Sequence, residues 1–116
     1  ISLHVPLNPE THHLIEARKL ELMKSDAVLV NTARGPIIDE QALIQSLTAR
    51  QIFAAGLDVF DGEPDVRQAL RELPNVLTLP HLGSATREDR LWTMELVIEG
   101  LVRVLGKPSA GSMPST

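Results

Sequence analysis

The stretch AVLVNTARG, residues 27–35, gives the strongest indication of the fold. Its first four residues are all apolar, without polar alternation, which is typical of a strand buried on both faces of a parallel sheet. The run ends in a small polar pair and then Arg34, whose charge needs solvent, a carboxylate or an anionic ligand as a partner. We therefore expect a parallel strand here, with a functional or solvated cation after its carboxyl end.

Similar patterns predict the other elements of the chain. Further strands are expected over ISLHV (1–5), FAAGLDVF (53–60) and NVLTLP (75–80). Helices are expected in the later part of 11–24, from Asp39 over 39–50, and over 86–105, whereas the charged segment 61–73 is expected to be a loop. Asp39 fits an N-cap, and Thr86 with Asp89 fits a capping box. Strands that alternate with helices predict an α/β fold with a parallel sheet.

The composition is that of an ordinary globular chain. Its 116 residues fit one domain, and a net charge of -4 gives no electrostatic reason to expect binding to nucleic acid or an anionic membrane. There is no cysteine, which excludes thiolate metal sites in this sequence and suits the cytoplasm. No apolar run approaches the roughly 20 residues that a membrane-spanning helix needs. The last ten residues, 107–116, are small, polar and proline-containing, and we expect a disordered tail there.

Polar side chains follow three of the predicted strands. Arg34 follows the second strand, Asp58 lies near the end of the third, and His81 follows the fourth. The carboxyl ends of parallel strands meet at one edge of a sheet, and ligands bind at that edge. We expect these side chains there, together with Glu63 from the loop after the third strand.

Arg34, Glu63 and His81 together suit the reduction of a 2-keto acid. An arginine can bind a carboxylate through two parallel hydrogen bonds, and a histidine can donate a proton near neutral pH. A glutamate beside the histidine would orient its ring and stabilise the imidazolium form. Because no side chain supplies hydride, this chemistry requires a cofactor.

Each of these residues also has a purely structural explanation. An arginine after a strand is most often solvated or salt-bridged, and Glu63 lies in a charged loop. His81, next to Pro80, could cap the loop with one ring nitrogen. His12 and His13 are better explained as exposed polar residues at a helix start than as a metal site. The residues alone leave both explanations open, and the coincidence of several polar groups at strand ends favours function.

Four segments resemble, in order and spacing, the family of D-isomer-specific 2-hydroxyacid dehydrogenases, which includes glyoxylate and hydroxypyruvate reductases and phosphoglycerate dehydrogenase. The resemblance extends from Ile1 to about Gly106 and implies the second half of a Rossmann-like NAD(P)-binding domain over residues 1–106. The family's GxGxxG loop, ribose-binding acid and substrate-side domain do not occur in this sequence, so we expect a truncated half domain. The four segments are HVPLNPETHHLI (4–15), MKSDAVLVNTARGPIIDEQAL (23–43), AAGLDVFDGEP (54–64) and NVLTLPHLGSAT (75–86).

The resemblance implies a role for individual residues. Arg34 matches the arginine that binds the substrate carboxylate, Glu63 the acidic partner and His81 the acid/base histidine. The formate-oxidising branch carries glutamine at the position of Glu63, so Glu63 favours a reductase of 2-keto acids. Asp58 matches the aspartate that contacts the nicotinamide carboxamide. The complete set that the resemblance places at the NAD or NADP cleft is Val5, Pro6, Thr32, Ala33, Arg34, Asp58, His81, Gly83 and Ser84.

The implied function is hydride transfer between NAD(P)H and a small 2-keto or 2-hydroxy acid, of the glyoxylate or hydroxypyruvate type. The isolated chain is expected to be inactive and to bind the dinucleotide weakly. It is also expected to form a homo-oligomer, such as a dimer, because a sheet divided between its halves exposes an edge and an apolar face. The alternative is a non-catalytic binding or assembly module that resembles the dehydrogenase-like corepressors.

Overall fold

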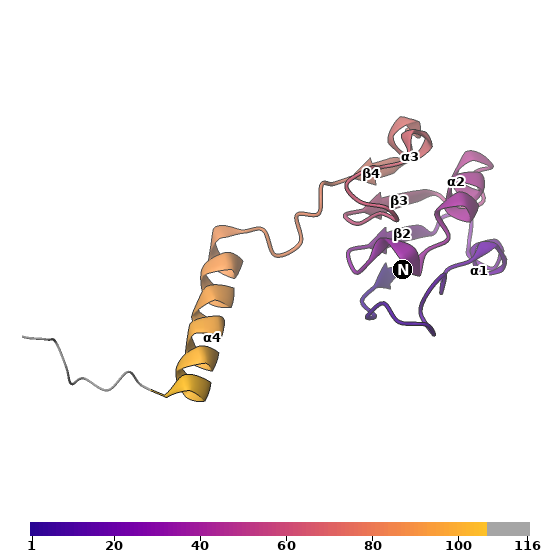
Figure 1. The fold of residues 1–116 in the computed structure, drawn as a ribbon. Helices are drawn as coiled ribbons and strands as arrows, with labels where there is room; N and C mark the ends of the chain where they lie inside the picture. Colours follow the sequence, from indigo (N-terminus) through magenta and orange to yellow (C-terminus); the bar gives the residue numbers. More distant parts are fainter. Residues whose placement is uncertain (107–116) are drawn as a thin grey trace, which may run out of the picture. The chain divides into compact units, whose positions relative to one another are not determined.

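The computed structural model describes residues 1–106 of the chain. They form two compact units, one of Ile1–Gly83 and one that begins at Ser84 (Figure 1). The predicted tail over 107–116 lies outside the described residues. The prediction that residues 1–106 form one segment of a cofactor domain stays a prediction.

The first unit is built on a four-stranded parallel sheet in which the strands lie side by side in chain order. In the register, Val30 pairs with Ser2 on one side and with Gly56 on the other, and Leu57 pairs with Thr78. The predicted parallel α/β fold is therefore confirmed, and all four strands end at the same edge of the sheet. The strands are β1 (Ser2–Leu3), β2 (Val28–Asn31), β3 (Ala54–Leu57) and β4 (Val76–Thr78).

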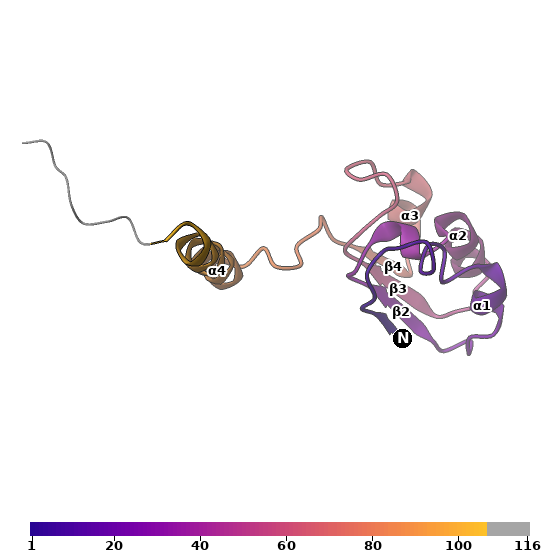
Figure 2. The same cartoon turned by 60° about the horizontal axis from the view of Figure 1, so that its bottom comes forward.

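Helices connect the strands, and α1 and α2 lie on the same side of the sheet (Figures 1 and 2). The core between these helices and the sheet contains Leu20 of α1, Leu43 and Leu47 of α2, and Leu29 and Leu57 of the sheet, all of which are buried. Burial of these side chains is the main stabilising contribution to a small unit of this kind. The helices of the first unit are α1 (Ala17–Glu21), the 3-10 helix η1 (Gly35–Ile37), α2 (Glu40–Thr48) and α3 (Gln68–Glu72).

The expectation that AVLV is buried on both faces of the sheet is wrong. Leu29 is fully buried, but Val28 is 42% exposed and Val30 is half-buried. Exposure alternates along β2 because the helices of this unit pack on only one face of the sheet. The other face forms an open groove of about 700 Å³ whose lining includes Val28, Phe53 and Leu77.

One helical segment agrees with the prediction and another differs from it. The helix expected in the later part of 11–24 is confirmed as α1 (Ala17–Glu21), and before it the Asn8 side chain forms turns by accepting hydrogen bonds from the N–H groups of Glu10 and Thr11. In the segment that was predicted as a loop, α3 forms where Leu70 inserts fully into the core. Burial of one leucine stabilises this helix despite its charged surroundings.

Both predicted N-caps are confirmed. The Asp39 side chain accepts a hydrogen bond from the Ala42 N–H (3.0 Å) at the start of α2. In the second unit, Thr86 Oγ1 accepts one from the Asp89 N–H (3.1 Å) at the start of α4 (Arg87–Leu105). The predicted helix over 86–105 is thus confirmed, although its apolar stripe is not buried. None of the helices within residues 1–106 is both long enough and apolar enough to cross a membrane.

Candidate functional site

The loop after β2 places Arg34 at the carboxyl edge of the sheet. Asn31, the last residue of β2, is buried, and its side chain accepts a hydrogen bond from the Ala33 N–H (3.0 Å) and donates one to the Arg34 carbonyl (2.9 Å). These bonds fold the loop back onto its strand. The exposed Arg34 guanidinium donates to the Ala33 carbonyl (2.6 Å), and no carboxylate in residues 1–106 forms a salt bridge with it. Its remaining donors can therefore bind an anion.

Gly35 brings the loop after β2 into backbone contact with the loop after β3. A Cβ atom at Gly35 would lie only 1.9 Å from the carbonyl carbon of Phe60 and 2.3 Å from the Asp61 nitrogen. Only glycine fits at such a distance. The contact fixes the backbone next to Arg34 against the loop that carries Glu63.

Asp58 follows β3 directly and is 4% exposed. Its two carboxylate oxygens accept hydrogen bonds from the backbone N–H groups of Leu82 and Gly83, each at 2.7 Å. Its own N–H donates to the Asn31 carbonyl (3.0 Å). A buried carboxylate needs such partners, and here they tie the loop after β4 to the ends of β2 and β3.

Glu63 and His81 meet at this edge. Glu63 Oε2 lies 2.6 Å from His81 Nδ1, and Glu63 Oε1 accepts a hydrogen bond from the Phe60 N–H (2.9 Å). The hydrogen bond with His81 lowers the pKa of Glu63 below its ordinary value of 4.5. Burial opposes this by raising the pKa in part, whereas the Phe60 N–H and the charges of His81 and Arg34 lower it further. Glu63 is therefore ionised at neutral pH.

The backbone of His81 holds its ring toward Glu63 in an uncommon conformation. Its φ is 54°, in the left-handed region, and the bonds from the next two N–H groups to Asp58 stabilise this loop. The imidazole is 47% exposed. Since Nδ1 is bound by the carboxylate, Nε2 is the nitrogen that can exchange a proton with a ligand.

Five of the predicted cofactor-cleft residues line one open pocket of about 650 Å³ beside the ends of β1 and β2. The loop after β1 is fixed by Thr11, whose hydroxyl donates to the Pro6 carbonyl (2.6 Å). Of the predicted residues, Ser84 belongs to the second unit, where it is exposed and has a φ of 63°. The residues that line the pocket are His4, Val5, Pro6, Leu7, Thr32, Ala33 and Arg34.

Several residues of this region were not identified from the sequence. His4 and Leu7 flank the predicted pair Val5 and Pro6, and their position next to this pair is the signal that could have identified them. Asn31 carries a recognisable signal, because an asparagine at the end of an apolar strand favours a turn. Glu40, a buried carboxylate that accepts a hydrogen bond from the Asp61 N–H, carries none, since its burial depends on a loop far along the chain.

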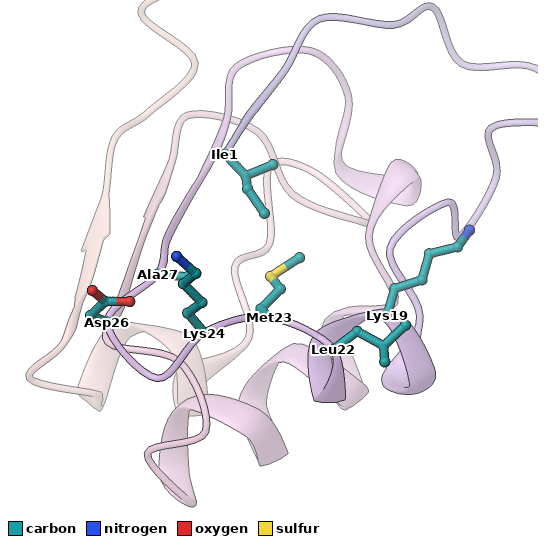
Figure 3. A pocket seen from close by; sticks show the side chains of 7 residues that line it. All are labelled: Ile1, Lys19, Leu22, Met23, Lys24, Asp26 and Ala27. Atoms are coloured by element: carbon teal, nitrogen blue, oxygen red, sulfur yellow. The ribbon is translucent and has the colours of Figure 1, made fainter.

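A second pocket, of about 480 Å³, lies at the amino edge of the sheet (Figure 3). Its lining includes Ile1, which precedes β1, and Ala27, which precedes β2, and none of the predicted site residues. Parallel sheets bind ligands at their carboxyl edge, so the pocket beside Arg34 is the better candidate. No group of three or more histidine or acidic side chains within residues 1–106 is arranged to hold a metal ion.

Comparison with known proteins identifies the family. Residues 1–83 match the model of the family described as "D-isomer specific 2-hydroxyacid dehydrogenase, NAD binding domain". The chain belongs to this family. The match coincides with the first structural unit and includes Arg34, Glu63 and His81.

Relatives of this dehydrogenase domain are glyoxylate and hydroxypyruvate reductases. Glyoxylate reductase of Thermococcus litoralis is 50% identical over 102 residues, which cover 88% of this chain and 31% of the relative. Glyoxylate reductase 1 of Saccharomyces cerevisiae is 48% identical over 105 residues, covering 90% of this chain and 30% of the relative. The chain therefore spans about a third of the length of these relatives.

Solved structures agree with the fold. The glyoxylate reductase of Paecilomyes thermophila superposes with a TM-score of 0.87 at 40% identity, over 91% of this chain and 32% of that one. The NADPH-dependent glyoxylate/hydroxypyruvate reductase of Sinorhizobium meliloti, solved in complex with NADP and malonate, gives 0.87 at 37% identity, over 91% and 33%. The predicted Rossmann-like half domain is confirmed.

Proposed function

We propose that this chain carries part of the active site of an NAD(P)-dependent 2-hydroxyacid dehydrogenase, and that the whole enzyme reduces a small 2-keto acid of the glyoxylate or hydroxypyruvate type. The observation that carries this proposal is the Glu63–His81 pair, 2.6 Å apart at the carboxyl edge of the sheet. The names of the relatives support the substrate class.

Each of the three residues has one role in the proposed reaction. Arg34 binds the carboxylate of the keto acid, for which its guanidinium geometry is suited. His81 donates the proton from Nε2 to the carbonyl oxygen of the substrate. Glu63 accepts the Nδ1–H of His81, which orients the ring and stabilises its charged form. Because Nδ1 is bound to Glu63, proton transfer takes place at Nε2.

The pocket beside Arg34 has the chemistry that the nicotinamide end of NAD(P)H requires. Val5, Pro6 and Ala33 give it apolar walls, and Thr32 adds a hydroxyl. When bound there, NAD(P)H supplies the hydride. Each Asp58 oxygen keeps a second lone pair beside its backbone bond, so Asp58 can hold the His81 loop and also accept a bond from the carboxamide.

A graft into a relative tests this function. The 102 matching residues of the Thermococcus litoralis enzyme would be replaced by those of this chain, and oxidation of NADH and NADPH would be followed with glyoxylate and with hydroxypyruvate. We expect turnover of at least one of the two acids. A graft that folds and binds a dinucleotide, but reduces neither acid, would contradict the proposal and favour the non-catalytic binding module.

A further inference from the structure

Glu40 is a buried carboxylate to which the proposed reaction assigns no role. It is the first residue of α2 and is 6% exposed. Its Oε1 accepts a hydrogen bond from the Asp61 N–H (2.6 Å), and its Oε2 accepts one from Arg67 Nε (3.0 Å). Burying a carboxylate is costly unless its oxygens have charged or N–H partners, so these two bonds account for its position.

Both bonds reach the loop that carries Glu63. Asp61 precedes Glu63 in that loop, and Arg67 follows it at the N-cap of α3. The partners are 21 and 27 residues from Glu40 along the chain. Glu40 therefore joins the start of α2 to the loop on both sides of Glu63.

The backbone at Phe60 and Asp61 is fixed by three residues. The Phe60 N–H donates to Glu63, the Asp61 N–H donates to Glu40, and Gly35 lies directly against the peptide between them. The amide that orients Glu63 is thus next to the amide that Glu40 binds. If the Asp61 amide is released from Glu40, the neighbouring Phe60 amide loses the support that sets its direction.

We propose that Glu40 is a positioning residue, which holds the loop of residues 60–67 so that Glu63 meets His81 Nδ1. The inference rests on the proposed function, because the Glu63–His81 pair matters for rate only where His81 transfers the proton. Glu40 itself forms a hydrogen bond with neither partner of that pair, and it acts through the backbone of Asp61 and the side chain of Arg67.

Two variants remove different parts of this support. Glu40→Gln keeps the size of the side chain and an oxygen for the Asp61 N–H, but it removes the charge that pairs with Arg67. Arg67→Met removes only the second bond, at a half-exposed side chain, and leaves Glu40 with its Asp61 partner. Gln41→Ala, exposed on the same helical turn, is the neutral control, and Leu47→Ala destabilises the core at the other end of α2.

The first readout is NMR on the 116-residue chain. In Glu40→Gln we expect amide exchange at Asp61 to rise about tenfold, because a charge-assisted bond is replaced by a weaker neutral one. In both variants we expect the Glu63 carboxyl to titrate closer to its ordinary pKa of 4.5. Gln41→Ala and Leu47→Ala should leave that titration unchanged. An unchanged Glu63 titration in both Glu40→Gln and Arg67→Met would overturn the proposal, whether or not Asp61 exchanges faster.

The second readout is activity in the graft. Glu40→Gln is expected to lower kcat about tenfold, since it misplaces Glu63, the partner of the proton donor His81. The KM for glyoxylate should change little, because Arg34 stays in place. Unchanged kcat in an active graft would also overturn the proposal. If the unmodified graft folds and binds a dinucleotide but is inactive, the proposed function fails, and the NMR result alone decides the role of Glu40.

Discussion

The hydrogen bond from His81 makes Glu63 a stronger acid than an ordinary glutamic acid. Because the folded pKa lies below the unfolded value, this interaction stabilises the fold above about pH 4.5 and is lost as the pH falls through the folded pKa. His81→Ala removes the largest cause, so we expect the pKa of Glu63 to rise toward 4.5. A ¹³C NMR titration of the Glu63 carboxyl measures this. The same low pKa in His81→Ala would show that the pair is not formed.

Gly35 gives a second test at the scale of one residue. In Gly35→Ala the new Cβ would overlap the Phe60 carbonyl, so we expect a loss of about 3 kcal/mol or more in the free energy of unfolding. Gly56→Ala is a matched control, because its Cβ would meet nothing closer than Val30 Cγ2 at 3.9 Å. Urea unfolding compares the two. Equal stabilities would refute the close contact between the loops.

The proposed catalytic residues could be predicted from the sequence, but their supports could not. Arg34, Glu63 and His81 lie in recognisable segments at the ends of strands. Asn31 offers a local turn signal but its bonds to the loop do not follow from it, and Glu40 is an ordinary polar residue in the sequence that becomes important only because folding buries it against a loop. The backbone contacts that hold the site depend on such long-range packing, which no local pattern indicates.

The start of α2 is bonded to the loop that carries Glu63. Asp39 caps the helix, and the next residue, Glu40, binds the loop after β3. Asp39→Ala is expected to lower the free energy of unfolding by about 1 kcal/mol, because one N-terminal N–H of α2 loses its acceptor. Gln45→Ala, exposed on the same helix, should change it by less than about 0.5 kcal/mol. Indistinguishable urea midpoints for the two variants would contradict the cap.

Element prediction succeeded where local signals agree with the packing. The strands and the caps were predictable because apolar runs and capping residues act locally. The helix α3 was not, because its formation depends on Leu70 filling a space in the core. The apolar run of β2 also indicated two covered faces, whereas one face of this sheet has no covering helix in the first unit.

At the scale of the whole molecule, the uncovered sheet face is strongly apolar. Phe53 and Leu77 are each 62% exposed, and Val28 lies beside them on the lining of the same groove. Exposed apolar surface of this kind favours association. This surface agrees with the homo-oligomer expected from the sequence, which stays a prediction. Sedimentation at increasing protein concentration can test it.

The isolated chain is predicted to bind NADH weakly. It contains no GxGxxG loop for the pyrophosphate, and each missing charge-assisted bond removes about 1.5–3 kcal/mol of binding free energy. A fluorescence titration of the 116-residue chain with NADH should therefore give no saturation in the micromolar range. Micromolar affinity would mean that the pocket beside Arg34 is sufficient for binding.

The central claim is that His81, held by Glu63, transfers the proton in keto-acid reduction. The most direct measurement is the steady-state rate of NAD(P)H oxidation with glyoxylate by the graft, with and without His81→Ala. We expect this variant to lose about 100-fold or more in kcat, as for removal of a general acid, while His12→Ala, at an exposed histidine, keeps the full rate. An equally active His81→Ala graft would contradict the account.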